Sequence, residues 1–133
     1  MNRHAKLTGN QRRILQALSR ADSPLGAYAL LERVGLSGPA QVYRALDKLM
    51  ALGLVRRLES LNAYVRSSER DASRPTAFAI CDQCGHIDQL VDGSLAQCLQ
   101  RLANGRAFEF RRAVIEVHGK CSACCASEQA GHD

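Results

Sequence analysis

The chain has 133 residues and a formal net charge of +5, so it can bury one modest core or two small ones. It contains no apolar run of about 18 residues, and we expect a soluble protein that does not interact with membranes. Tryptophan is absent and aromatic residues make up only 5%, which argues against a stacking platform for single-stranded nucleic acid. No signal segment opens the chain, so its six cysteines favour metal binding in a reducing cytoplasm over disulfides.

Positive charge is concentrated in the N-terminal half. Residues 1–75 hold 13 Lys and Arg against 6 Asp and Glu, whereas residues 76–133 hold 5 against 7. A basic half next to a near-neutral one favours a polyanionic partner for the basic half. An ordinary solvated basic surface is the alternative.

The basic half shows three helical patterns followed by two strand patterns. Apolar residues recur at helical spacing in stretches that end near Ser19, at Gly35 and at Gly53. Thr8 with Gln11 forms a capping box before the first stretch, and Pro39 opens the third. Strand patterns follow at residues 54–58 and 63–65. This is the layout of a winged helix-turn-helix, in which the third helix reads the DNA major groove.

The expected DNA contacts are polar side chains outside the apolar stripe of the third helix. Arg44 suits guanine or phosphate, and Tyr43 suits a thymine methyl group or a phosphate. On the hairpin, Arg56, Arg57 and Arg66 suit phosphates better than bases, because their long side chains stand at a hairpin edge. A small helical domain with a basic surface is the alternative. The residues predicted to contact DNA from the third helix are Gln41, Tyr43, Arg44 and Lys48.

Two Cys-x-x-Cys pairs, separated by 36 residues, mark the second half. Four thiolates offered two by two suit tetrahedral zinc, and Gly85 follows the first pair as in a zinc-knuckle turn. A redox or disulfide role and plain buried cysteines are the alternatives. Cys98 is expected to be buried in a helix, and Cys125 to be a spare ligand or a surface thiol. The predicted ligands of one structural zinc per chain are Cys81, Cys84, Cys121 and Cys124.

The domain organisation follows from a change of pattern. Residues 67–75 are rich in Ser and charge, which predicts a linker after a winged-helix domain at residues 1–66. Residues 76–126 are expected to form a small αβ dimerisation domain and residues 127–133 a tail, giving an α+β fold. Such a small domain with exposed strands favours a homodimer, which paired recognition helices also require. Its expected elements are strands at 76–80 and 87–91, a helix at 95–102, and one or two strands within 108–117.

Several segments in order carry a family pattern: Pro24-Leu25-Gly26-Ala27-Tyr28, Val42-Tyr43-Arg44-Ala45-Leu46-Asp47, Asn62-Ala63-Tyr64-Val65, Ile80-Cys81-Asp82-Gln83-Cys84-Gly85 and Ile115-Glu116-Val117-His118-Gly119-Lys120-Cys121. Together they resemble the ferric uptake regulator family of metal-responsive repressors, and its zinc uptake regulator branch most closely. The resemblance covers nearly the whole chain. It implies a dimeric, DNA-binding repressor of metal-uptake genes in which the four cysteines hold structural zinc. It also implies that Tyr28, Tyr43 and Arg44 touch operator DNA.

The chain departs from this resemblance at the site where the zinc branch senses its metal. That site takes a histidine just after Gly-Leu-Val, a cysteine after the wing strand, a histidine in the linker, and a glutamate five residues past the first cysteine pair. A guanidinium cannot ligate zinc and stays charged, so we expect DNA binding that does not depend on a regulatory zinc. The corresponding residues here are Arg56, Ser67, Arg74 and Gln89.

Two substitutes for the missing site are considered, and the competing outcome is that loss of the ligands leaves a loose hinge between the two domains and weak DNA binding. Arg56 and Arg74 are hypothesised to replace the metal with arginine–carboxylate pairs, the candidate partners being Glu59, Glu69, Asp71 and Asp88. Alternatively, His86 and His118, with Asp88 and Glu116 close by, could hold a second metal, although a lone histidine on a strand is more often structural. His4 and His132 are assigned no role.

No catalytic constellation is present: no serine is placed with a histidine base, and neither a phosphate loop nor an open metal site is found. We therefore expect no enzyme activity and no small-molecule substrate. The leading hypothesis is a sequence-specific transcription regulator that binds double-stranded operator DNA. The alternatives are a zinc-ribbon module for protein interaction and a thiol-redox protein that uses Cys81 and Cys84.

Overall fold

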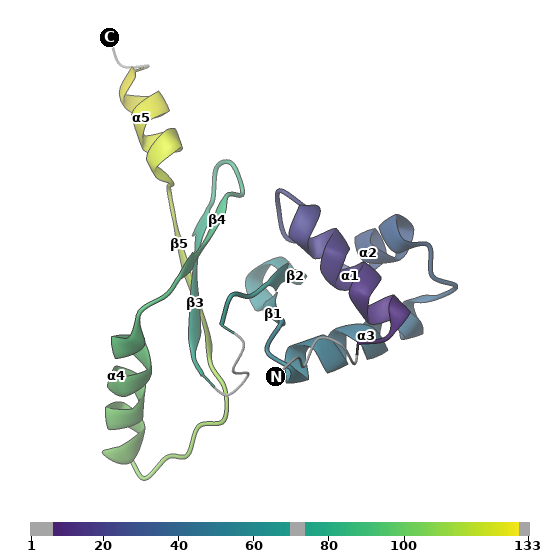
Figure 1. Cartoon of the computed structure of the whole chain (residues 1–133). Helices are drawn as coiled ribbons and strands as arrows, with labels where there is room; N and C mark the ends of the chain where they lie inside the picture. Colours follow the sequence, from purple (N-terminus) through teal and green to yellow (C-terminus); the bar gives the residue numbers. More distant parts are fainter. Residues whose placement is uncertain (1–6, 70–73, 131–133) are drawn as a thin grey trace. The chain divides into compact units, whose positions relative to one another are not determined.

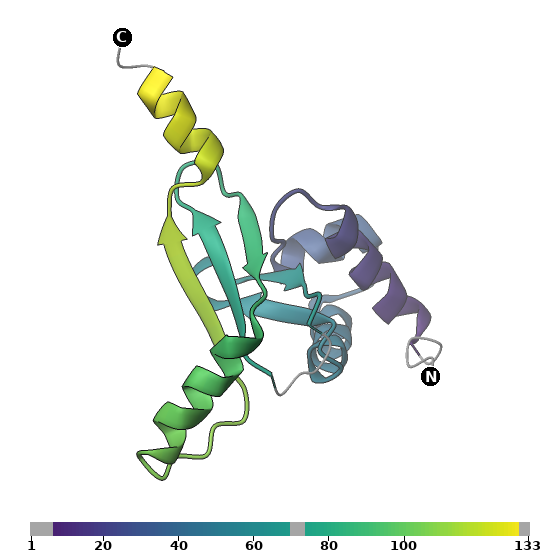
Figure 2. The ribbon, with the colours of Figure 1, turned by 60° about the vertical axis from the view of Figure 1, so that its left-hand side comes forward.

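The computed structural model describes residues 7–69 and 74–130, and the chain forms two compact units, Met1–Ala72 and Ser73–Asp133 (Figures 1 and 2). The boundary falls inside the predicted linker at residues 67–75. His4, Asp71 and His132 lie outside the described residues. Within the described part of the chain, every helix is too short or too polar to cross a bilayer.

Three helices of the first unit begin and end where local signals predict. They are α1 (Gly9–Arg20), α2 (Ala27–Val34) and α3 (Pro39–Ala51). The Thr8 hydroxyl accepts from the Gln11 N–H at 3.2 Å, and the Gln11 side chain accepts from the Thr8 N–H at 3.0 Å, which confirms the capping box. Gly35 ends α2 with φ of 77°, a left-handed conformation that glycine adopts without steric cost.

The hairpin packs against these helices. Strand β1 (Val55–Leu58) pairs antiparallel with β2 (Ala63–Arg66) across a short 3₁₀ turn at Glu59–Leu61. Leu25, ahead of α2, forms an isolated bridge with Tyr64 and extends this small sheet. The apolar stripe of α3 packs into the core, and the opposite face of the helix is exposed to solvent. Fully buried residues of this core include Ile14, Leu30, Val42, Leu46, Leu49 and Val55.

The second unit is built on a three-stranded sheet in the order β4-β3-β5. Strand β3 (Thr76–Cys81) runs antiparallel to β4 (Ile87–Leu90) and parallel to β5 (Val114–Gly119). Helices α4 (Gly93–Asn104) and α5 (Ser122–Ala130) complete the unit. Phe108 and Phe110 precede β5 without joining a strand. Residues 127–130, predicted as part of a tail, belong instead to α5, a helix that the sequence patterns did not predict.

Few side chains are buried in this second unit. Ala103 is the one buried residue of α4, and Cys98 on the same helix is exposed, so the prediction of a buried thiol is wrong for the single chain. A sheet of three strands with one neighbouring helix is too small to enclose all of its apolar groups. Apolar side chains that remain exposed are Leu90, Val91, Leu102, Phe108 and Val117.

Candidate functional site

The two cysteine pairs meet at one end of the sheet. Cys81 is the last residue of β3, and its parallel pairing with Gly119 brings the segment after β5 alongside the first pair. The Sγ atoms of Cys81 and Cys124 are 3.7 Å apart, and those of Cys84 and Cys121 are 3.6 Å apart. Four sulfurs at about 2.3 Å from a tetrahedral zinc would be about 3.8 Å from one another. The thiol arrangement therefore fits zinc, and the predicted ligand set converges.

Backbone N–H groups favour the negative charge that a zinc ligand needs. The N–H groups of Cys84 and Cys121 point at the Cys81 sulfur from 3.5 and 3.4 Å, and they lower the pKa of Cys81 to about 6. Hydrogen bonding with the thiols of Cys121 and Cys81 raises the pKa of Cys124 to about 12. Gly85, at φ of 79°, completes the turn by donating to the Cys81 carbonyl at 3.0 Å.

The same contacts show what a metal would change here. The His86 N–H alone would lower the pKa of Cys84, but the thiols of Cys121 and Cys81 outweigh it and raise the pKa. Four crowded thiols resist ionising together, because each new thiolate meets a neighbouring negative charge. A zinc ion held by these four residues would supply the positive charge that allows all four to ionise, and it would link β3 to α5.

The histidines near this cluster pair with carboxylates. His86 Nε2 lies 3.2 Å from an oxygen of Asp88, and His118 lies 3.3 Å from Asp82 through Nδ1 and 3.5 Å from Glu116 through Nε2. In residues 7–69 and 74–130, the four cysteines form the only convergent group of three or more ligating side chains. Cys125 lies outside that group and is a surface thiol. A second metal at His86 and His118 stays a prediction.

Helix α3 presents a polar stripe to solvent. Tyr43 is 44% exposed, and Arg44 and Lys48 are exposed on the same helix. Asp47 also lies on this stripe, four residues from Tyr43 and three from Arg44, and it was not among the predicted contacts although helical spacing places it there. Gln41 instead accepts from the Ser37 N–H at 3.1 Å, so its side chain helps to begin the helix.

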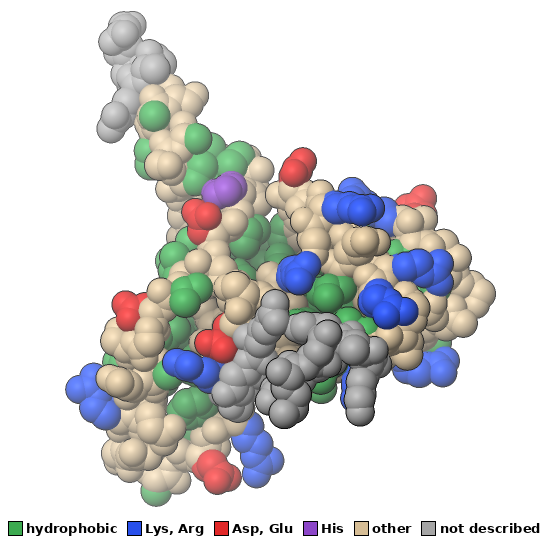
Figure 3. Space-filling model, viewed as in Figure 1, with side chains coloured by type: hydrophobic (Ala, Val, Ile, Leu, Met, Phe, Trp, Pro, Cys, Tyr) green, Lys and Arg blue, Asp and Glu red, His purple; other side chains and the backbone are tan. Residues whose placement is uncertain are grey.

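The predicted DNA contacts outside α3 differ in exposure and in hydrogen bonding. Tyr28, on α2, is 68% exposed. The Arg57 guanidinium donates to both carboxylate oxygens of Glu59, at 2.6 and 2.7 Å, and to the Asn62 side chain at 2.7 Å. Arg57 is therefore already engaged within the wing, and Glu59 competes with a DNA phosphate for its guanidinium. Figure 3 shows Lys and Arg side chains spread over the surface of the first unit.

Comparison with known proteins identifies the family. The model of the ferric uptake regulator family matches residues 2–118. The chain belongs to this family. It is 36% identical to the zinc uptake regulation protein of Escherichia coli, over 98% of this chain and 79% of that protein. It is 28% identical to the ferric uptake regulation protein of Legionella pneumophila, over 72% of this chain and 70% of that one.

Solved structures agree with this assignment. The crystal structure of holo XcZur superposes with a TM-score of 0.85 at 36% identity, covering 94% of this chain and 90% of that one. A zinc uptake regulator complexed with zinc and DNA gives a TM-score of 0.85 at 34% identity, covering 96% of this chain and 89% of that one. The fold is that of the zinc uptake regulators.

Two of the positions that the resemblance assigns to a sensory metal, Arg56 and Ser67, are buried in this structure. Arg56 is only 4% exposed and donates to the Glu69 carbonyl at 3.1 Å, so the prediction that it contacts phosphate is wrong. Ser67 is 3% exposed, and its hydroxyl accepts from the Glu69 N–H at 3.1 Å. The segment at residues 67–69, predicted as linker, is thereby hydrogen-bonded to β1 through the Arg56 side chain.

Proposed function

We propose that this chain is a sequence-specific, DNA-binding transcription regulator of metal-uptake or related genes, acting as a repressor in the cytoplasm. The observation that carries the proposal is the exposed polar stripe of α3, with Tyr43, Arg44, Asp47 and Lys48 held above a buried core. A helix of this kind fits the major groove, and its arginine and aspartate suit guanine and cytosine edges. The related zinc uptake regulator has been solved with zinc and DNA.

The proposed active form is a homodimer with one structural zinc per chain. The second unit leaves Leu102, Phe108 and Val117 exposed, and β4 and β5 are both edge strands. Covering these groups with a second copy would remove apolar surface from water. A dimer also presents two α3 helices to the two halves of a palindromic operator.

A genome-wide binding map followed by footprinting tests the DNA-binding function. The wild-type protein is expected to protect a discrete palindromic site, and Arg44→Ala is expected to lose that site while keeping its structural zinc. Arg101→Ala, an exposed change on α4, serves as the control. Salt-independent binding to a protein and none to DNA would instead favour the zinc-ribbon interaction module. A reversible disulfide between Cys81 and Cys84 would favour the thiol-redox protein.

The proposed regulator does not use a sensory zinc. Two of the four expected ligand positions hold Arg56 and Ser67, which are buried and hydrogen-bonded to Glu69. The bond from Arg56 to the Glu69 carbonyl ties the segment after the wing to β1, and the Ser67 hydroxyl holds Glu69 within that segment. A guanidinium offers zinc no lone pair and the Ser67 hydroxyl is already hydrogen-bonded, so this part of the first unit does not depend on a bound metal.

Zinc titration tests this independence. Operator affinity is measured at fixed salt as zinc is added to protein whose four-cysteine site is already full. Less than a threefold change is expected, and a gain of about tenfold, equal to about 1.4 kcal/mol of coupling, would contradict the proposal. A complementary variant restores the expected ligands and should make binding zinc-dependent. It combines Arg56→His, Ser67→Cys, Arg74→His and Gln89→Glu.

A further inference from the structure

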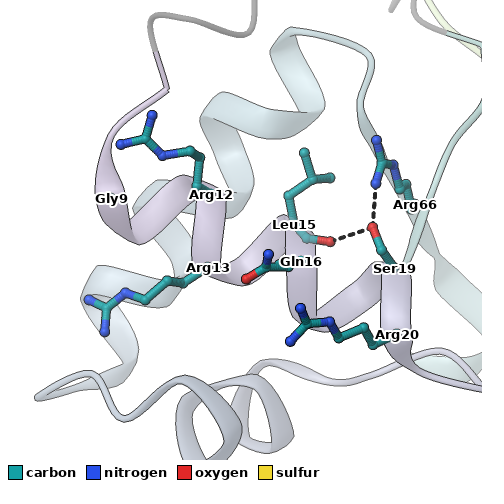
Figure 4. Close-up of a pocket in the computed structure, with 8 residues that line it drawn as sticks. All are labelled: Gly9, Arg12, Arg13, Leu15, Gln16, Ser19, Arg20 and Arg66. Carbon is teal, nitrogen blue, oxygen red and sulfur yellow. Dashed lines mark hydrogen bonds between the residues drawn. The ribbon is translucent and has the colours of Figure 1, made fainter.

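A basic groove lies between α1 and the end of β2, on the first unit (Figure 4). It is an open pocket of about 570 Å³, and we call it the α1–β2 groove. Its polar lining side chains are Arg12, Arg13, Arg20, Arg66, Gln16 and Ser19. Among the described residues that line it, four are arginines and none is acidic. The groove therefore concentrates positive charge without an internal counterion.

Two elements build this groove. Arg12, Gln16 and Arg20 follow one another at four-residue spacing on α1, so they share one face of the helix, opposite to the residues that enter the core. Arg66 comes from β2 and donates to the Ser19 hydroxyl, which itself donates to the Leu15 carbonyl at 2.9 Å. Figure 4 shows this chain of bonds, which holds the strand arginine beside the helix.

The side chains that line the groove indicate which kind of ligand it can bind. Four exposed guanidinium groups suit an anion with several charges, because each can donate to phosphate oxygens. The lining contains no aromatic side chain on which a base could stack, which disfavours single-stranded nucleic acid and free nucleotides. From Arg12 to Arg20 the helix rises by about 12 Å. That length of duplex axis carries about seven phosphate charges.

We propose that the α1–β2 groove binds the sugar-phosphate backbone of duplex DNA, apart from the base-reading stripe on α3. The inference rests on the proposed DNA-binding function and adds a contact surface to it. Because phosphates carry no sequence information, this surface raises affinity for every duplex equally and increases the salt dependence of binding. It leaves the choice of operator to α3.

The test is the double variant Arg12→Gln/Arg20→Gln, which removes two charges from exposed positions and keeps good helix formers. Binding is measured between about 50 and 200 mM salt to two probes. One is a duplex selected by the wild-type protein from a random library, and the other is a scrambled duplex of the same length. The salt slope should fall by about two, so that wild-type affinity drops about tenfold more than variant affinity across this range. The ratio between the probes should not change.

Matched measurements separate the possible failures. Arg101→Gln/Arg112→Gln removes the same charge from the second unit and should leave the slope at its wild-type value. An unchanged slope for Arg12→Gln/Arg20→Gln, or an equal loss in the control, would overturn the inference while leaving the proposed function intact. Wild-type protein that binds neither duplex would overturn the proposed function itself. In sedimentation, wild type and variant should bind DNA in the same ratio to protein, and loss of a bound duplex in the variant would show that the groove holds separate DNA and would overturn the inference.

Discussion

Replacing Glu59 with glutamine is expected to tighten DNA binding. Glu59 lies in the turn of the wing, where both of its carboxylate oxygens accept from the Arg57 guanidinium at 2.6 and 2.7 Å. This carboxylate therefore occupies the arginine in the way that a DNA phosphate would. The amide that replaces the carboxylate has no charge, so Arg57 becomes available to the DNA backbone.

The size of the effect follows from the exposure of the pair. The Arg57 side chain is 35% exposed and that of Glu59 is 74% exposed, so water screens their attraction. Exposed pairs contribute about 0.2–1 kcal/mol, which corresponds to a gain in DNA affinity of about 1.4- to 5-fold. Asn62 continues to accept from Arg57 at 2.7 Å and keeps the guanidinium in place, which favours the upper part of this range.

A double-mutant cycle measured by fluorescence anisotropy would isolate this term. Binding of wild-type, Glu59→Gln, Arg57→Ala and the double variant is compared at several salt concentrations. The gain from Glu59→Gln should vanish in the Arg57→Ala background. Asp22→Asn, which removes one exposed negative charge elsewhere in the first unit, is the control. An equal gain in the Arg57→Ala background would show that only overall charge matters and would refute the reasoning.

Four further outcomes are expected. Cys84→Ser should lose zinc and dimer together, because binding of a structural zinc is worth about 10–16 kcal/mol and is coupled to folding; an intact zinc-free dimer would contradict this. Zinc affinity, measured by chelator competition, should rise at least about a hundredfold from pH 7 to 8, because the pKa values of Cys84 and Cys124 are raised and both thiols must lose a proton to bind zinc. Below about pH 6 the affinity should fall more steeply with decreasing pH, because Cys81 is then protonated as well. Arg44→Ala should weaken operator binding by about 1–3 kcal/mol and relax base preference; an equal loss on scrambled DNA would exclude base reading. Phe108→Glu should shift the protein to monomer in sedimentation, because a charge replaces an exposed apolar side chain.

The sequence by itself determined the features that depend on neighbouring residues. The Thr8 capping box and the Gly35 helix end are bonds between groups a few residues apart, so their patterns predict the first two helices closely. The four zinc ligands were likewise readable, because the Cys-x-x-Cys spacing reflects the geometry of one tight turn. Hydrophobic periodicity then supplied the winged-helix layout and most of the expected DNA contacts, and the family resemblance added Tyr28.

The same local signals did not predict the environment of each side chain. Arg56 and Arg57 are adjacent in the sequence, and both were expected to reach phosphate. The structure buries Arg56, which donates to the Glu69 carbonyl, and pairs Arg57 with Glu59. Alternation along a strand sends neighbouring side chains to opposite faces, but only the packed chain decides what covers each face.

Tertiary structure alone decided the contacts between distant segments. The pairing of β3 with β5 sets which sulfur lies beside which, and it brings Cys81 to Cys124 across 43 residues. The packing of β2 on α1 brings Arg66 to Ser19 across 47 residues and so creates the α1–β2 groove. These contacts depend on how whole elements pack against one another, which no short stretch of sequence encodes.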